Sequence, residues 1–142
     1  DKSQSAAIER LREEPIWSGP RKNRLDPFMY GGYCVKVYDK SSGNLIFSRG
    51  FNTLFEEWRT TDQAKNETQS WCNTVCVPMP KNNVIVELLE RNRKDGKFYT
   101  MLKQEIDPKS IFIVISRIAH KIIFLLHTRL KIMCIFVCIM FC

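Results

Sequence analysis

The sequence contains little of the histidine that many catalytic sites require. Its 142 residues include two histidines, His120 and His127, so residues 1–119 contain none. A Ser–His or Cys–His pair is therefore excluded from that part of the chain, because the nucleophile needs a base beside it. The two histidines are seven residues apart with no acidic residue between them, unlike the i, i+4 pair of zinc proteases. We expect no catalytic residue, no cofactor and no metal site in this chain, which predicts that it is not an enzyme.

A concentrated run of positive charge is absent as well. The net charge is +7, but residues 1–110 contain 18 Lys and Arg against 15 Asp and Glu. Nucleic-acid binding depends on many cations gathered on one face, whereas cations and anions are interleaved along this part of the chain. We therefore expect no nucleic-acid partner.

Two further sequence signals are missing. No glycine-rich phosphate loop is present, and Tyr30-Gly31-Gly32-Tyr33 is typical of a turn that enters a strand. No signal peptide is visible at the start of the sequence, which begins Asp1-Lys2-Ser3 without an initiator methionine. We interpret the chain as a processed product or a fragment.

The six cysteines do not form the pattern of a disulfide framework. Cys72 and Cys76 are four residues apart, which on a strand is about 13 Å and beyond the reach of a disulfide. Three others, Cys134, Cys138 and Cys142, lie at the C-terminal end. We expect scattered and mostly unpaired thiols.

Alternating apolar residues predict a β-rich fold. Short strands separated by turns favour a β-sandwich over a βαβ sheet. The turn at 40–44 and the Asp95-Gly96 pair predict two hairpins, over 33–49 and 84–106. The strands that the alternation predicts are 33–39, 45–48, 71–77, 84–90 and 98–106.

The remaining segments predict short helices and irregular chain. Leu54, Phe55 and Trp58 share one helical face, and Thr60 with Gln63 fits a capping box for a second short helix. Residues 1–14 are polar, with apolar spacing that suits one or two helical turns. We expect residues 15–32 to be irregular because their prolines interrupt helices, with Trp17 and Phe28 as anchors in the body of the domain.

The composition changes abruptly after residue 113, which predicts a domain over 1–113 and an apolar, basic tail over 114–142. The tail has 21 apolar residues among 29 and no acidic residue. A membrane helix needs about 20 mostly apolar residues, but the longest uncharged run, 132–142, has 11. Arg129 and Lys131 would each cost about 2.5–3.5 kcal/mol at a helix centre. Two hypotheses stay open, an aberrant extension and a membrane-associated segment.

Aromatic side chains are the candidates for a binding surface. Five of them could line a face that binds a sugar or a peptide, and the alternative is that they fill the core and hold the loops. The candidate binding residues are Trp17, Trp58 and Trp71, and the other two aromatics are Phe28 and Tyr30.

Several short runs resemble the N-terminal domain of the IgA-peptidase family of secreted bacterial zinc metallopeptidases. The resemblance covers about residues 1–113, and residues 48–61 are its most specific part. The other runs are Glu14-Pro15-Ile16-Trp17, Asp26-Pro27-Phe28, Tyr38-Asp39, Pro78-Met79-Pro80-Lys81 and Ile106-Asp107-Pro108.

The resemblance implies an immunoglobulin-like β-sandwich of unassigned function that precedes a separate catalytic domain. The zinc-binding HExxH of the family would lie in that domain, which is absent from this chain. It also implies an extracytoplasmic or secreted protein and a first strand upstream of Asp1. We therefore expect a non-catalytic accessory domain that supports the protease or binds an extracellular ligand. Two alternatives are a β-sandwich module that binds a glycan or a protein, and a small tail-anchored membrane protein.

Overall fold

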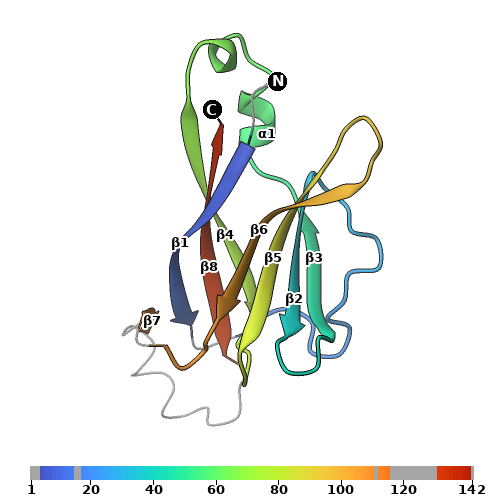
Figure 1. Ribbon diagram of the computed structural model, residues 1–142, viewed down its shortest axis with the longest axis vertical. Coiled ribbons are helices and arrows are strands. Elements are labelled where there is room, and N and C mark those ends of the chain that lie inside the picture. Colours follow the sequence, from blue (N-terminus) through green and yellow to red (C-terminus); the bar gives the residue numbers. More distant parts are fainter. Residues whose placement is uncertain (1–3, 15–16, 111, 116–130, 142) are drawn as a thin grey trace.

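The computed structural model describes residues 4–14, 17–110, 112–115 and 131–141 (Figure 1). Within these ranges most of the regular secondary structure is β-strand, as predicted. The two short helices are α1 (Phe55–Trp58) and the 3₁₀ turn η1 (Gln63–Lys65). The strands are β1 (Gln4–Glu14), β2 (Tyr33–Asp39), β3 (Leu45–Phe51), β4 (Gln69–Pro78), β5 (Val84–Arg91), β6 (Phe98–Ile106), β7 (Ile113–Ile115) and β8 (Ile132–Phe141).

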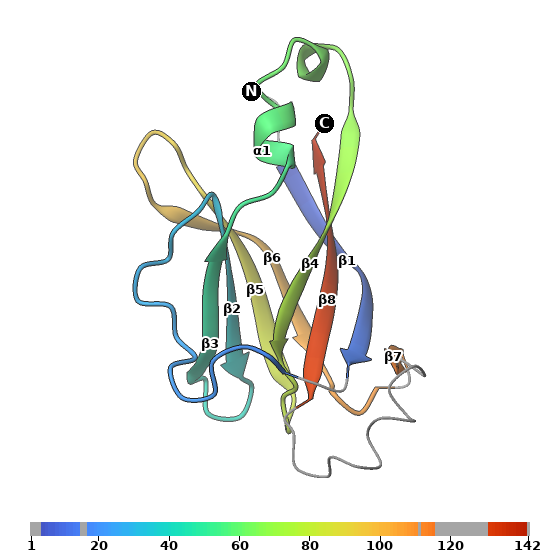
Figure 2. The same ribbon diagram turned by 180° about the vertical axis from the view of Figure 1, so that it is seen from behind.

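The strands form two four-stranded sheets that pack face to face. The first sheet has the order β4-β8-β1-β7, and the second has the order β3-β2-β5-β6. Neighbouring strands are antiparallel, except that β1 and β7 run parallel. Figures 1 and 2 show the two layers crossing, with α1 beside the start of β1 and the end of β8. The predicted all-β sandwich with short helical turns is confirmed, and both predicted hairpins are present as β2–β3 and β5–β6.

The core lies between the two sheets. Alternate residues of β2 and β5 point inward from the second sheet, and alternate residues of β4 and β8 do so from the first. Burial of each large apolar side chain stabilises the fold by about 1.5–3 kcal/mol. The inward residues include Val35, Val37, Val86, Leu88, Val75, Val77, Met133 and Ile135.

The end of the chain is part of this core. Strand β8 lies between β4 and β1, where it is drawn in red in Figure 1. Met133, Ile135 and Ile139 are at most 1% exposed. A central strand therefore buries apolar side chains of the predicted tail, among them Ile132 and Val137. The predicted division into a domain over 1–113 and a tail over 114–142 stays a prediction.

The membrane hypothesis relied on a helix within the tail. Residues 132–141 form a strand of the first sheet instead. Across the described ranges, no helix has both the length and the apolar character needed to cross a bilayer. Residues 116–130 and 142, which include His120, His127 and Arg129, lie outside the described residues.

The expected helical turns near the N-terminus are wrong. Gln4–Glu14 is strand β1, which pairs with β8 along its whole length. The register shifts between Ile8 and Arg10, as at a β-bulge. A bulge inserts one extra residue, so Ile8 and Leu11 pack against the core three residues apart. This spacing imitates a helical face in the sequence.

The helix prediction over residues 54–58 is confirmed by α1, in which Phe55 and Trp58 are buried. The predicted capping box is wrong. The residue before η1 is Asp62, without a side-chain cap, and the Thr60 hydroxyl donates to the carbonyl oxygen of Glu57 at 2.7 Å.

Candidate functional site

The structure places the three predicted binding tryptophans in or beside the core. Trp17 is 5% exposed and Trp58 is 8% exposed, while Trp71 is half-buried. Trp58 and Trp71 lie together, with ring centroids 6.4 Å apart. Trp17 packs edge-on against Phe47 and donates its indole N–H to the carbonyl oxygen of Pro20 at 3.1 Å. A binding role for these three residues stays a prediction, and two of the rings are turned away from solvent.

The other two of the five candidate aromatic rings are exposed. Phe28 is 67% exposed and Tyr30 is 74% exposed. Their rings stack in parallel, with centroids 5.4 Å apart and planes 3° apart. The prediction that Phe28 anchors its segment in the body of the domain is therefore wrong. Both residues belong to residues 24–31, which we call the aromatic loop.

Asp26 organises the aromatic loop. Its carboxylate accepts hydrogen bonds from the backbone N–H groups of Phe28 at 3.0 Å and Met29 at 3.1 Å, and from Gly50 in β3 at 2.9 Å. These bonds hold the pKa of Asp26 below its ordinary value because they stabilise the charged form. The bond from Gly50 contributes most to this lowering. The backbone N–H of Asp26 donates to the Ser48 hydroxyl at 2.9 Å. One side chain thus joins the turn of the loop to the neighbouring strand.

The backbone of the loop lies directly against β3 and β5. A Cβ atom on Gly50 would lie 2.0 Å from the carbonyl oxygen of Tyr30, so only glycine fits there. Met29 has a φ of 52°, an uncommon left-handed conformation for a residue with a side chain. The Arg91 guanidinium donates to the carbonyl oxygens of Met29 at 2.6 Å and Gly31 at 3.0 Å. The backbone of the loop is therefore held by contacts with both strands.

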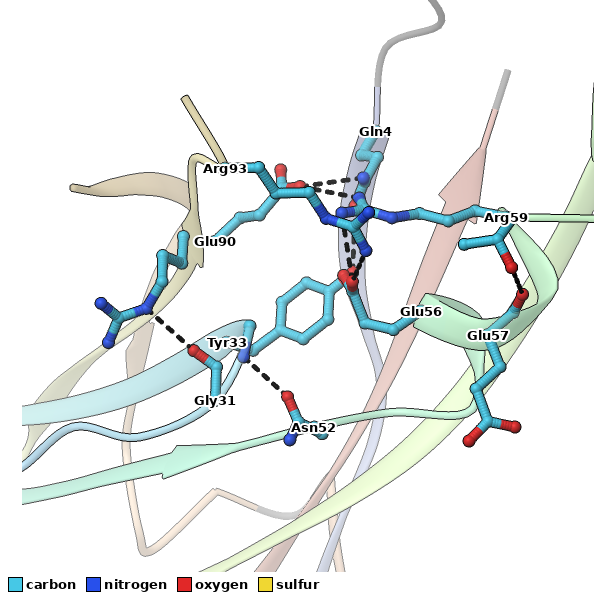
Figure 3. Close-up of polar contacts among 12 residues, drawn as sticks. Gln4, Gly31, Tyr33, Asn52, Glu56, Glu57, Arg59, Glu90 and Arg93 are labelled. Atoms are coloured by element: carbon cyan, nitrogen blue, oxygen red, sulfur yellow. Dashed lines mark hydrogen bonds and ion pairs between the residues drawn. The ribbon is translucent and has the colours of Figure 1, made fainter. Parts of the chain in front are cut away.

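A polar cluster lies at the same end of the second sheet as the aromatic loop (Figure 3). The Tyr33 hydroxyl donates to the side chain of Gln4 at 3.1 Å, and Gln4 donates to Glu90 at 2.9 Å. Burial first, and then the nearby charge of Glu56, raise the pKa of Tyr33, so its phenol stays protonated as a donor. The members of the cluster are Gln4, Tyr33, Glu56, Arg59, Glu90 and Arg93.

Arg59 connects the polar cluster to the helix. It contacts Glu90 at 3.2 Å and Glu56 at 3.1 Å, and Arg93 contacts Glu56 at 2.5 Å. The Arg59 side chain is 13% exposed and that of Glu56 is 18% exposed. Each of these charges has an opposite charge beside it, so the cluster ties α1 to β1, β2 and β5. Its contacts hold these elements together, and they leave no free nucleophile–base pair among these residues.

Residues 48–61, the most specific part of the sequence resemblance, supply contacts to both the aromatic loop and the polar cluster. Ser48 and Gly50 hold the aromatic loop, while Glu56 and Arg59 belong to the polar cluster. Between them, the Asn52 side chain accepts a hydrogen bond from the backbone N–H of Gly32 at 2.7 Å. The run therefore connects the aromatic loop and the polar cluster to the sandwich.

No group of three or more His, Cys, Asp or Glu side chains is arranged to hold a metal ion in the described part of the chain. The two histidines lie outside it. The absence of a metal site from the chain as a whole stays a prediction.

Comparison with known proteins identifies this sandwich. The family model described as Peptidase M64 N-terminus matches residues 1–102, which include β1 to β5 and most of the hairpin partner β6. No curated protein matches the chain. The matched range contains the aromatic loop, the polar cluster and the whole of residues 48–61, and it confirms the resemblance to a peptidase N-terminal domain. The chain belongs to the family of Peptidase M64 N-terminal domains.

Proposed function

We propose that this chain is a non-catalytic accessory domain of an M64 peptidase, which docks on the catalytic domain through the aromatic loop. The observation that carries this proposal is the exposed, stacked pair of Phe28 and Tyr30 on a loop held by Asp26 and Arg91. The family is defined as the N-terminal part of a peptidase, so a peptidase domain is the partner that its description implies. We expect the domain to work outside the cytoplasm, as part of a secreted protein.

Exposed aromatic rings suit a docking surface for physical reasons. Aromatic residues are enriched at protein interfaces and dominate many of them energetically. Each ring can bury about 150–250 Å². A loop that is already fixed loses little conformational entropy on binding. Leu25, which is 48% exposed in the same loop, adds to the apolar surface.

The test uses the isolated catalytic domain of a full-length M64 peptidase, added to this chain in solution. Isothermal titration calorimetry would measure the affinity of the unchanged chain and of the double variant Phe28→Ser/Tyr30→Ser. We expect the double variant to bind at least about tenfold more weakly, as for the loss of an interface hot spot. Tyr99→Ser is the matched control, because Tyr99 is an exposed aromatic residue, at 53%, outside the loop.

Equal affinities for the double variant and the unchanged chain would refute docking through the loop. Binding of an oligosaccharide that requires Phe28 and Tyr30, without binding to the catalytic domain, would replace this function by a glycan-binding one. Zinc-dependent proteolysis by the purified chain, lost with a chelator, would refute its non-catalytic role.

A further inference from the structure

Two cysteines face each other across the first sheet. Cys76 in β4 and Cys134 in β8 are directly opposite in the antiparallel register. Their sulfur atoms lie 3.3 Å apart, in van der Waals contact, and both are thiols in the structure. The sequence alone could not pair them, since they are 58 residues apart.

The hydrogen-bond pattern of the strands places this pair at a position whose geometry suits a disulfide. The backbone N–H of Met79 donates to the carbonyl oxygen of Lys131 at 2.9 Å, which makes these opposite residues a hydrogen-bonded pair. Such pairs alternate with non-hydrogen-bonded ones along an antiparallel ladder. Pro78, which has no N–H, is therefore at a non-hydrogen-bonded position, and so is Cys76 two residues earlier.

Opposite residues at non-hydrogen-bonded positions have Cα atoms about 4.5 Å apart. This value lies within the range of about 4.4–6.8 Å that a disulfide spans. Closing the sulfur–sulfur distance from 3.3 Å to a covalent bond then needs only side-chain rotation. The backbone of Cys72 lies opposite that of Cys138 in the same ladder, four residues away.

We propose that Cys76 and Cys134 are a disulfide-forming site, which closes by exchange with an external low-molecular-weight disulfide and ties edge strand β4 to central strand β8. Cys76 reacts first because it is the more exposed of the two and lines an open hollow beside Trp17 and Phe47. Burial, followed by the contact with Cys76, raises the pKa of Cys134 to about 12. Cys134 is therefore the weaker nucleophile toward an external disulfide, and its contact with Cys76 places it to attack only after Cys76 has reacted.

The exchange balances in two steps. The Cys76 thiol first loses its proton to water. Its thiolate attacks one sulfur of the external disulfide, forming a mixed disulfide and releasing one thiolate, which takes a proton. Cys134 then gives up its proton, and its sulfur attacks the Cys76 sulfur and releases the second thiolate. The two protein thiols are oxidised to one disulfide, and the external disulfide is reduced to two thiols.

The test uses oxidised glutathione as the probe and the full chain carrying Cys72→Ser, Cys138→Ser and Cys142→Ser. Only Cys34, Cys76 and Cys134 then remain. Trypsin cleaves after Lys65, Lys81 and Lys131, so a linked pair of peptides 66–81 and 132–142 can arise only from Cys76 and Cys134. We expect this linked pair after oxidation and its loss after reduction. Alkylation of both thiols after oxidation, without the linked pair, would overturn the proposal.

Thermal unfolding gives a second measurement on the same variant. A disulfide that closes a loop of this length should raise Tm by about 10 °C on oxidation. The matched control adds Cys76→Ser, and its Tm should not respond to oxidised glutathione. An equal rise in this control would overturn the proposal.

The unsubstituted chain keeps the test decisive if the triple variant does not fold. Chymotrypsin cleaves after Phe136 and so separates Cys134 from Cys138, and peptide fragmentation distinguishes Cys72 from Cys76. We expect a Cys76–Cys134 link in the oxidised chain. Any set of links that leaves out this pair would refute the proposal.

Discussion

The carboxylate of Asp26 accepts a hydrogen bond from the backbone N–H of Gly50 at 2.9 Å, across 24 residues of sequence. This bond joins two of the runs that resemble the peptidase N-terminal domain, Asp26-Pro27-Phe28 and residues 48–61. Because the same carboxylate also closes the turn at Phe28 and Met29, it acts together with Arg91 to position the exposed aromatic pair.

Removal of this carboxylate should destabilise the domain. We expect Asp26→Ala to lower the free energy of unfolding by about 2 kcal/mol, as for hydrogen bonds to a charged group. The measurement is urea denaturation at neutral pH. The control is Asp62→Ala, because Asp62 forms an exposed ion pair with Lys65 and should change stability by less than about 0.5 kcal/mol. Equal losses in the two variants would contradict the role of Asp26.

The contribution of Asp26 should also depend on pH. Its pKa is lowered in the folded state, so the folded protein holds the charged form more tightly than the unfolded chain does. The stabilisation is therefore complete above the unfolded pKa, about 3.9, and is lost as the pH falls through the lower folded value. We expect the difference in unfolding free energy between the unchanged chain and Asp26→Asn to shrink as the pH falls below about 4. A difference that stays constant between neutral and acid pH would contradict this prediction.

Substitution of Gly50 should displace the aromatic loop. Gly50→Ala puts a methyl group 2.0 Å from the carbonyl oxygen of Tyr30, a backbone atom. We expect a loss of about 3 kcal/mol in unfolding free energy, at the upper end of overpacking costs. In Gly43→Ala the added methyl meets nothing within 4 Å, although φ is +69°, so its cost should be only about 1 kcal/mol of backbone strain. Urea denaturation compares the two, and an equal cost would refute the close approach.

The apolar end of the chain should be needed for folding. Ile135 in β8 is 1% exposed, and Ile135→Ala should cost about 3 kcal/mol through the lost burial and the cavity it leaves. Ile46→Ala removes the same atoms from a residue that is 37% exposed, and should cost less than about 1 kcal/mol. A cost for Ile135→Ala that does not exceed the control would show that β8 is dispensable. Chemical denaturation of both variants decides between these outcomes.

Local patterns were sufficient for much of the fold. The alternation of Tyr33, Val35 and Val37, and the Asp95-Gly96 turn, predicted the hairpins because adjacent strands depend on nearby residues. Phe55 and Trp58 predicted α1 for the same reason. The resemblance pointed to residues 48–61, but the partners of Ser48, Gly50 and Glu56 lie in other segments.

The sequence predictions that failed concern places where segments far apart in the chain meet. The bulge between Ile8 and Arg10 shifts the phase of β1, so its spacing resembled a helix. The exposure of Phe28 depends on how Asp26 turns the loop, which periodicity cannot indicate. The continuous apolar run of β8 has no alternation to read, because side chains on its second face are buried too, including Ile132 and Cys134.

The sequence by itself determined the class of the fold, the two hairpins and the family, because these depend on local periodicity, turn residues and short runs that survive in any spatial arrangement. Only the tertiary structure decided that the apolar end becomes a central strand, that Phe28 and Tyr30 are exposed while Trp17 and Trp58 are buried, and that Cys76 meets Cys134. The reason is physical. The place of β8 and the meeting of the cysteines depend on the register between strands far apart in the chain, which packing between the sheets sets. The exposure of Phe28 and Tyr30 depends on the hydrogen bonds by which Asp26 turns the loop.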